Sequence, residues 1–259
     1  FYMDELLKII ILAIVQGITE FLPISSSGHL CLLKYFFGLN QDGALIEIVL
    51  HTGTLISIVL FYRRKIFKIF KSAFNKNEES SNFIYFVILA IIPIGIIGFV
   101  FGDSVEYVFS NIKLVCLFLI ITGIFLIFSN FFKIKESNLN FKNSFLIGVA
   151  QMFAILPGMS RSGMTIGMGN IMGINVRKSA EFSFIIAIPV LFGVIVKYFY
   201  NLNLDNISIS IENLLVGLIV SFITGLLTLK WLISLLNKGK LWYFGIYCIG
   251  IGTFSFLFF

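Results

Sequence analysis

Residues 16–29 read QGITEFLPISSSGH, and residues 151–163 read QMFAILPGMSRSG. Both segments begin with Gln, contain a Leu-Pro pair offset by one position, and share Ser-x-Ser-Gly in register. Each interrupts an apolar stretch with proline, glycine and hydroxyl side chains, which disfavour a continuous helix. We therefore expect two helical hairpins related by an internal repeat.

The composition requires a bilayer around most of the chain. The protein has 259 residues, of which 58% are hydrophobic and 12% charged, and its mean hydropathy is +1.00. A water-soluble domain could not cover so much apolar surface. The net charge of +6 falls mostly in short gaps between apolar stretches, which indicates cytoplasmic loops and no nucleic-acid partner. The three cysteines show no metal-ligand spacing and are interpreted as packing residues.

Six apolar stretches are long enough to cross a membrane as helices, which takes about 20 residues. They are residues 44–62, 83–102, 114–132, 181–200, 213–236 and 241–259. Residues 5–38 and 144–175 are instead apolar at both ends and broken in the middle, which favours re-entrant hairpins that leave the membrane by the side they entered. We predict an all-α polytopic membrane protein with six transmembrane helices and two re-entrant helical hairpins.

The charges of the loops test this topology. Basic loops are expected in the cytoplasm, and loops without Lys or Arg are expected outside. Residues 63–76, 133–142, 177–178 and 237–240 are basic, whereas residues 103–111 and 201–212 carry only acidic charges. These signs alternate correctly only if residues 144–175 form a hairpin and not a full span.

Each predicted hairpin is followed by three spans, so the second copy of the repeat is upside down relative to the first. We predict a single membrane domain over residues 1–259, with repeat one at 1–132 and repeat two at 144–259. Inverted-topology repeats bring their two broken segments together near the middle of the bilayer. The polar tips of the two hairpins should therefore meet.

The residue types at the two tips suit a phosphoryl-transfer site. A carboxylate or a guanidinium at membrane depth is costly unless it is paired, so we expect Glu20 and Arg161 to meet. Arg161 offers a planar fork of donors for phosphate oxygens, and the two half-helix N-termini add backbone amides. The hydroxyl groups expected around the phosphate belong to Ser25, Ser27, Ser160, Ser162 and Thr165.

The residues alone leave the nucleophile and the base open. Ser26 or Ser27 could attack phosphorus, and His29 lies about one helical turn beyond Ser26. Glu20 could orient His29, act as the base itself, or bind a divalent ion that bridges phosphate oxygens.

Structural explanations compete with these roles. Serine runs at helix starts are often only N-caps, and a membrane Glu-Arg pair can be purely structural. The joint occurrence of both hairpins with their polar residues favours a functional site. Glu47 and His51, four residues apart on the first span, are interpreted as a pair that satisfies itself or supports the site.

The segments from Gln16 to His29 and from Pro157 to Thr165 resemble the two signature motifs of the undecaprenyl-diphosphate phosphatase family, the membrane enzymes known for bacitracin resistance. The segments IVLHTGTL, from Ile48, and KSAEFSFIIAIP, from Lys178, extend the similarity over essentially the whole chain. The resemblance implies hydrolysis of a C55 polyprenyl diphosphate to the monophosphate lipid carrier used in cell-wall synthesis. It also implies a bacterial cell-membrane location, an active site open to the outer face, and a homodimer.

Matching positions imply that the catalytic residues are Glu20, Ser26, His29 and Arg161, with Ser160 and Thr165 helping to bind phosphate. The first motif of the family begins with Glu or Gln, and Gln16 can bind phosphate or a metal ion but cannot act as a base. Mg²⁺ or Ca²⁺, with Glu20 as a ligand, would offset charge on the leaving phosphate. We favour Ser26 as the nucleophile, assisted by His29 or Glu20, because a hydroxyl at the hairpin tip is the most accessible.

The alternative function is a transporter or flippase for a phosphorylated lipid or another anion, because inverted repeats with broken helices are a transporter architecture. The cluster of serines with a histidine favours an enzyme, since translocation needs weak reversible binding and no nucleophile. A passive structural protein would leave the buried charges unexplained.

Overall fold

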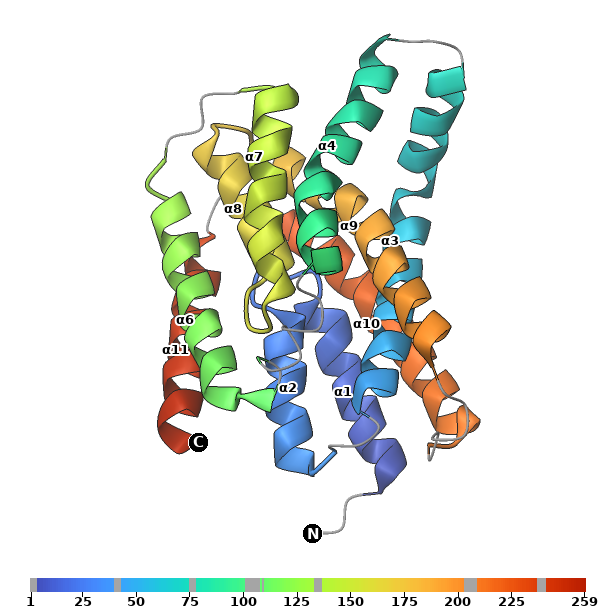
Figure 1. The fold of residues 1–259 in the computed structure, drawn as a ribbon, viewed down its shortest axis with the longest axis vertical. Coiled ribbons are helices and arrows are strands. Elements are labelled where there is room, and N and C mark those ends of the chain that lie inside the picture. The colour runs from blue at the N-terminus through green and yellow to red at the C-terminus, as the bar shows by residue number, and fades with distance from the viewer. Residues whose placement is uncertain are drawn as a thin grey trace.

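The structure is a computed structural model and describes residues 4–39, 43–74, 78–100, 108, 110–132, 137–202, 209–236 and 241–259. Every regular element in these ranges is a helix (Figure 1), which confirms the predicted all-α class. In chain order the elements are α1 (Glu5–Thr19), α2 (Ser26–Phe37), α3 (Gly43–Phe74), α4 (Glu78–Val100), α6 (Ile112–Ser129), α7 (Phe141–Met152), the 3₁₀ turn η1 (Phe153–Ile155), α8 (Arg161–Ile171), α9 (Val176–Asn201), α10 (Ile211–Leu236) and α11 (Trp242–Phe258).

Several of these helices are suited to a bilayer. Within the described ranges, α3, α4, α6, α9 and α10 are long and apolar enough to cross a membrane. The predicted sixth span coincides with α11, which has 17 residues and is shorter than those five. Large apolar side chains lie on the outer surface, for example Phe99, which is 91% exposed, and Leu257, which is 80% exposed. Such a surface indicates a polytopic membrane protein.

Three helices extend by five residues or more beyond their predicted bounds, among them α4, which begins at Glu78 and not at residue 83. Helix α3 continues through Arg63 and Lys65 to Phe74, and α9 begins at Val176, ahead of the apolar stretch predicted from residue 181. Lys and Arg are good helix formers, so a helix need not end where its apolar stretch ends. The predicted loop charges that fall in 75–77, 101–107, 133–136, 203–208 and 237–240 lie outside the described residues.

Two helix-turn-helix units form the polar centre. After α1 the chain turns through residues 20–25 and α2 runs back, and after α7 and η1 it turns through residues 156–160 into α8. In Figure 1 the pair α1 and α2 lies in the lower half of the molecule and the pair α7 and α8 in the upper half, with the two turns meeting between them. The two segments with the repeated motif are therefore in contact, although more than 100 residues separate them.

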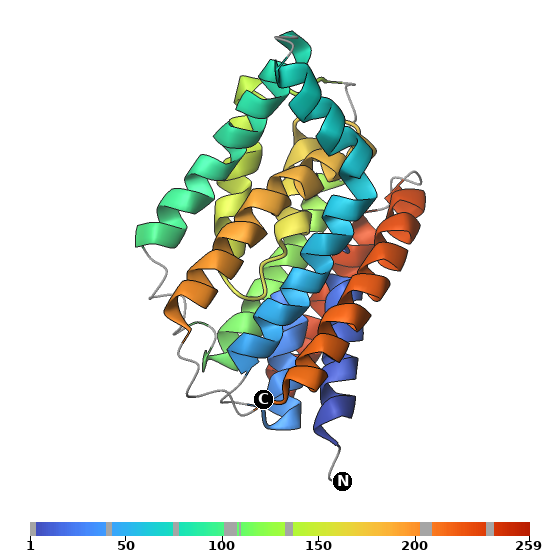
Figure 2. The ribbon, with the colours of Figure 1, turned by 90° about the vertical axis from the view of Figure 1, so that its right-hand side faces the viewer.

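The two halves of the chain interlock around this centre. Helix α1 packs against α10, and α7 packs against α4, so the first helix of each hairpin lies on a long helix from the other half. Helices α3 and α10 run side by side along the molecule (Figure 2), and α6 pairs with α11 in the same way. The hairpin tips are thus held from both halves of the sequence.

The crossing of α6 and α11 depends on two glycines. A Cβ atom at Gly245 would lie 2.7 Å from the carbonyl oxygen of Gly123, and one at Gly123 would lie 2.5 Å from the carbonyl oxygen of Gly245. Neither helix has room for a side chain there, so the two backbones touch. Small residues serve this purpose in membranes, where close van der Waals packing holds helices together. The contact keeps α11 beside the first hairpin.

Candidate active site

Each hairpin begins its second helix with a serine N-cap. The hydroxyl of Ser25 accepts a hydrogen bond from the backbone amide three residues later at 3.2 Å, and that of Ser160 does the same at 3.0 Å. An N-cap serine satisfies an amide that the helix leaves unpaired. The repeated Ser-x-Ser-Gly pattern therefore makes the same cap hydrogen bond in both hairpins, although the backbone at Ser25 has φ +68° and that at Ser160 has φ −76°. The residues that follow the caps, Ser26 and Arg161, begin their helices at the meeting point of the tips.

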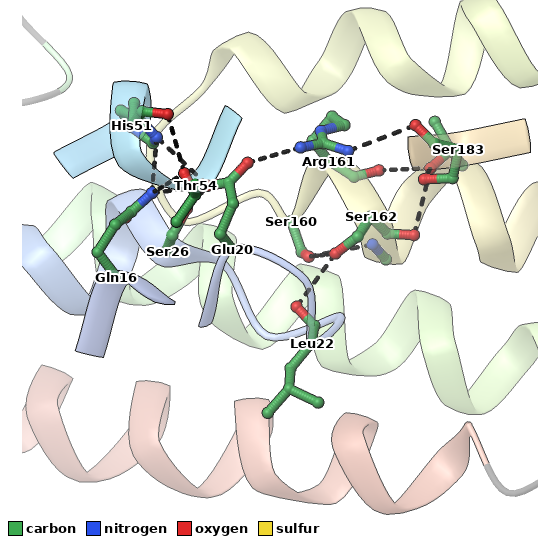
Figure 3. A network of polar contacts seen from close by, with 12 residues as sticks. Gln16, Glu20, Leu22, Ser26, His51, Thr54, Ser160, Arg161, Ser162 and Ser183 are labelled. Atoms are coloured by element: carbon green, nitrogen blue, oxygen red, sulfur yellow. Dashed lines mark hydrogen bonds and ion pairs between the residues drawn. The ribbon is translucent and has the colours of Figure 1, made fainter. Parts of the chain in front are cut away.

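Glu20 and Arg161 form an ion pair between the two hairpins. Arg161 Nη2 donates to Glu20 Oε1 at 2.6 Å (Figure 3), and the side chains are 13% and 5% exposed respectively. Each charge would be costly at this depth without the other. The prediction that these two residues meet is confirmed.

The other oxygen of Glu20 gathers a second set of polar groups. Ser26 Oγ donates to Glu20 Oε2 at 2.7 Å, and Gln16 Nε2 lies 3.0 Å from the same oxygen. Gln16 Nε2 also lies 2.7 Å from His51 Nδ1, which is itself 3.4 Å from Glu20 Oε2. One carboxylate therefore organises a hydroxyl, an amide, an imidazole and a guanidinium, as Figure 3 shows.

Groups of α8 and α9 surround Arg161. Arg161 Nη1 donates to the Ser183 carbonyl oxygen at 3.4 Å, and Thr165 Oγ1 lies 2.6 Å from Ser183 Oγ and donates to the Arg161 carbonyl at 2.8 Å. Ser162 Oγ donates to a backbone carbonyl of the first hairpin at 3.1 Å and lies 3.2 Å from Ser160 Oγ. Three predicted phosphate-binding residues, Ser160, Ser162 and Thr165, are thus close to Arg161 but buried, with protein partners for their oxygens.

The three consecutive serines of the first hairpin have different environments. Ser25 is buried, whereas Ser26 and Ser27 are partly exposed. Ser27 Oγ accepts from the backbone amide of Gly158 at 3.4 Å and lies 3.3 Å from Ser25 Oγ. Ser26 is the serine that contacts the Glu20 carboxylate, so it has both access and a proton acceptor.

His29 points away from Ser26. Its Nδ1 lies 2.7 Å from the Ser25 carbonyl oxygen, and its Nε2 lies 2.8 Å from the hydroxyl of Tyr247 on α11. Both ring nitrogens are therefore occupied by groups other than the Ser26 hydroxyl. Of the two assistants expected for Ser26, Glu20 is the one in hydrogen-bond contact with it.

Glu47 and His51 have separate partners. Glu47 forms an ion pair with Lys34 of α2, while His51 contacts Gln16 and Glu20. Because they are four residues apart, both lie on one face of α3. The first hairpin, however, places the cation of Lys34 beside Glu47 and the carboxylate of Glu20 beside His51. His51 therefore supports the site, as one of the two interpretations held.

Several polar neighbours of the site were not found from the sequence. Thr54, Ser183 and Tyr247 each bond a site residue, and Thr122 Oγ1 accepts from the Ser160 amide at 3.1 Å. The signal for each is only a polar residue within a stretch that is otherwise mainly apolar. That signal is weak, because such a hydroxyl often bonds only its own helix, as Thr52 does to the Ile48 carbonyl at 2.8 Å.

A divalent cation would have few protein ligands here. No group of three or more His, Cys, Asp and Glu side chains gathers as a metal site in the part of the chain that the structure describes. Gln16, however, donates to Glu20 through Nε2, and its Oε1 is buried without a hydrogen-bond partner. Mg²⁺ in particular is often bound through one or two carboxylates together with substrate phosphates and waters. Glu20 and Gln16 Oε1 therefore fit an ion that binds with the substrate.

The geometry suits transfer of a phosphoryl group. A carboxylate in contact with a partly exposed hydroxyl can accept its proton, and a guanidinium beside them can bind phosphate oxygens. These are the groups that an in-line attack on phosphorus needs, since catalysis of phosphoryl transfer is mainly positioning and charge stabilisation.

Comparisons with known proteins agree with this assessment. The family model described as "Bacitracin resistance protein BacA" matches residues 9–254. A protein of Christiangramia forsetii named undecaprenyl-diphosphatase is 38% identical over 260 residues, which cover 98% of each chain. One of Bacteroides fragilis with the same name is 38% identical over 256 residues, covering 96% of each chain. Undecaprenyl-diphosphatase 2 of Bacillus thuringiensis is 33% identical over 263 residues, covering 98% of this chain and 97% of its own.

Proposed function

The chain belongs to the bacitracin resistance protein BacA family, and we propose that it is an undecaprenyl-diphosphatase. It hydrolyses undecaprenyl diphosphate to the monophosphate and inorganic phosphate, and so returns the lipid carrier to cell-wall synthesis. The observation that carries this proposal is the contact of Glu20 with both Ser26 and Arg161 at the meeting point of the two hairpins. A carboxylate, a hydroxyl and a guanidinium are thereby gathered around one position.

Ser26 is the nucleophile in this proposal and Glu20 its base. As Ser26 Oγ attacks the terminal phosphorus, Glu20 Oε2 takes the hydroxyl proton across the 2.7 Å hydrogen bond. The bond from this phosphorus to the bridging oxygen breaks, and undecaprenyl monophosphate leaves with that oxygen. Glu20 passes this proton to the departing monophosphate. Water then attacks the phosphoserine and gives a proton to the freed carboxylate, which returns it to Ser26 Oγ as the phosphorus–Oγ bond breaks and inorganic phosphate leaves.

Arg161 binds the phosphate oxygens and stabilises the charge that develops on them. In the structure its fork is divided between Glu20 Oε1 and the Ser183 carbonyl. A diphosphate entering the site would exchange part of that contact for its own oxygens, which suit bidentate binding by Arg. The tip of the second hairpin, which carries Arg161, is stabilised by Ser160, Ser162 and Thr165. Ser27 is exposed enough to contact the substrate directly.

We propose that Mg²⁺ or Ca²⁺ binds together with the diphosphate. Glu20 and the unpartnered Gln16 Oε1 would hold it. When bound, the ion neutralises charge on the phosphate oxygens. Gln16 also orients the carboxylate through its Nε2, so it has a role whether or not the ion is present.

For the membrane we propose that the two hairpins are re-entrant, that they enter from opposite faces, and that α11 is the sixth span of an inverted repeat. Helix α1 packs on α10, and α7 packs on α4. The repeat relates α1 to α7 and α4 to α10, so each contact is the counterpart of the other, which supports an inverted relationship. The loop charges support a bacterial cell-membrane orientation with residues 63–76 inside. The family implies an active site open to the outer face and a homodimer.

Phosphate release from undecaprenyl diphosphate in detergent micelles tests the function, because transport has no meaning there. We expect release by the wild type and its loss in Ser26→Ala and Arg161→Ala. Arg63→Ala, which removes an exposed guanidinium bonded to its own helix, is the matched control and should keep full activity. If the folded wild type releases no phosphate at any Mg²⁺ or Ca²⁺ concentration, the proposal is wrong.

A further inference from the structure

The hydrogen bonds of His29 determine which of its nitrogens carries a proton. A carbonyl oxygen can only accept, so the 2.7 Å contact of Nδ1 with the Ser25 carbonyl places the hydrogen on Nδ1. In the neutral ring, Nε2 then carries a lone pair, and it accepts the Tyr247 hydroxyl hydrogen at 2.8 Å. The Ser25 carbonyl therefore selects the tautomer of His29, and Tyr247, on a different helix, supplies the donor that this tautomer needs at Nε2.

The carbonyl that His29 holds belongs to a strained residue. Ser25 has φ +68° and ψ +99°, and within the described residues it is the only non-glycine with positive φ. Residues other than glycine rarely adopt this backbone conformation, so surrounding contacts must maintain it. Three hydrogen bonds do so: the Ser25 carbonyl accepts from the His29 backbone amide at 3.3 Å and from its ring, and the Ser25 hydroxyl caps Gly28.

The conformation of Ser25 sets the direction of the next residue. Ser26 Oγ reaches Glu20 Oε2 because α2 begins at Ser26, immediately after this turn and six residues beyond Glu20. If the Ser25 peptide rotated toward an ordinary conformation, Ser26 would leave its base. Small displacements of a nucleophile have large effects on rate.

Tyr247 is well placed to stabilise the turn from outside the hairpin. Its ring stacks on that of His29 with centroids 5.6 Å apart and an interplanar angle of 3°. The neighbouring Cys248 Sγ lies 3.8 Å from the Pro23 carbonyl oxygen, so α11 contacts the first hairpin both at α2 and at the turn. The Gly123 and Gly245 crossing described above fixes the approach of α11, half a turn before Tyr247.

We propose that Tyr247 is a positioning residue for phosphate release: through His29 it holds the strained Ser25 turn that aims Ser26 at Glu20. The inference rests on the proposed function for its kinetic part. It assigns His29 a positioning role, with its Nδ1–H as the working group, and it gives α11 a part in the active site that no sequence motif indicates.

Nuclear magnetic resonance of ¹⁵N-histidine-labelled protein tests the contact directly, because the chain has only two histidines. The wild type should show His29 protonated on Nδ1, assigned by the loss of that signal in His29→Ala. In Tyr247→Phe the Nε2 resonance should shift, because its donor is gone. A wild-type His29 protonated on Nε2 alone overturns the inference, whatever the enzyme assay gives.

Kinetics then test the positioning role. Tyr247→Phe should lower kcat on the order of tenfold, the effect expected for one lost hydrogen bond, with KM close to that of the wild type. Tyr85→Phe, which removes a hydroxyl from the exposed face of α4, is the matched control and should change neither constant. An unchanged kcat in Tyr247→Phe, or an effect confined to KM, contradicts the proposal.

A second pair of variants separates positioning by His29 from catalysis by its ring. The side-chain amide of His29→Asn supplies an N–H near the position of Nδ1, so this variant should retain more activity than His29→Ala. Equal loss in both would overturn the inference. If the wild type released no phosphate, the proposed function would fail, while the tautomer measurement would still decide the Tyr247 contact.

Discussion

Replacing Glu20 by Gln is the sharpest test of the proposed chemistry. The substitution keeps the shape of the side chain but removes the charge that faces Arg161 at 2.6 Å and the base that faces Ser26 at 2.7 Å. Loss of a general base lowers kcat by about 10²–10⁴-fold. Breaking a buried ion pair by deleting one partner costs about 3–5 kcal/mol. Because the glutamine oxygen can still accept from Arg161, we expect a smaller loss of stability, about 1–3 kcal/mol.

The assay is phosphate release in micelles, with thermal unfolding measured on the same preparation. Glu47→Gln is the matched control, since it neutralises a carboxylate of α3 and breaks its ion pair with Lys34 of the first hairpin. Its kcat should stay close to that of the wild type. The reasoning is refuted if folded Glu20→Gln keeps kcat within about tenfold of the wild type, because Ser26 would then give its proton to another group.

Three further outcomes are expected. Gly245→Val should destabilise the protein by about 1–3 kcal/mol by separating α11 from α6, whereas Gly250→Ala, where a Cβ meets nothing within 4 Å, should not lower the unfolding temperature. In sealed vesicles, a cysteine in place of Lys142 should be labelled from the cytoplasmic side and one in place of Glu212 from outside, with little background from the buried native cysteines; labelling of both from one side would disprove the inverted arrangement. Chelation should abolish phosphate release and Mg²⁺ or Ca²⁺ should restore it, and activity that persists in chelator would remove the ion from the proposal.

Much of the architecture follows from local features of the sequence. An apolar stretch of bilayer length forms a helix because lipid offers no partner for its backbone groups, so the six predicted spans coincide with helices. The interruptions at Pro23 and Pro157 mark the hairpin turns for the same local reason. The meeting of Glu20 and Arg161 could also be predicted, because two opposite charges at membrane depth need one another.

What the sequence by itself determined, therefore, is the helices, the broken segments and the charged pair at their tips. Only the tertiary structure decided the partners of each ring and hydroxyl: that His29 turns to Tyr247, that His51 supports Glu20 while Glu47 pairs with Lys34, and that Ser26 is the serine beside the carboxylate. The physical reason is the distance along the chain over which each feature is determined. Helix formation and the cost of a buried charge depend on a few neighbouring residues. A hydrogen bond depends on atomic positions to within a few tenths of an ångström, and these are set by helices distant in the chain.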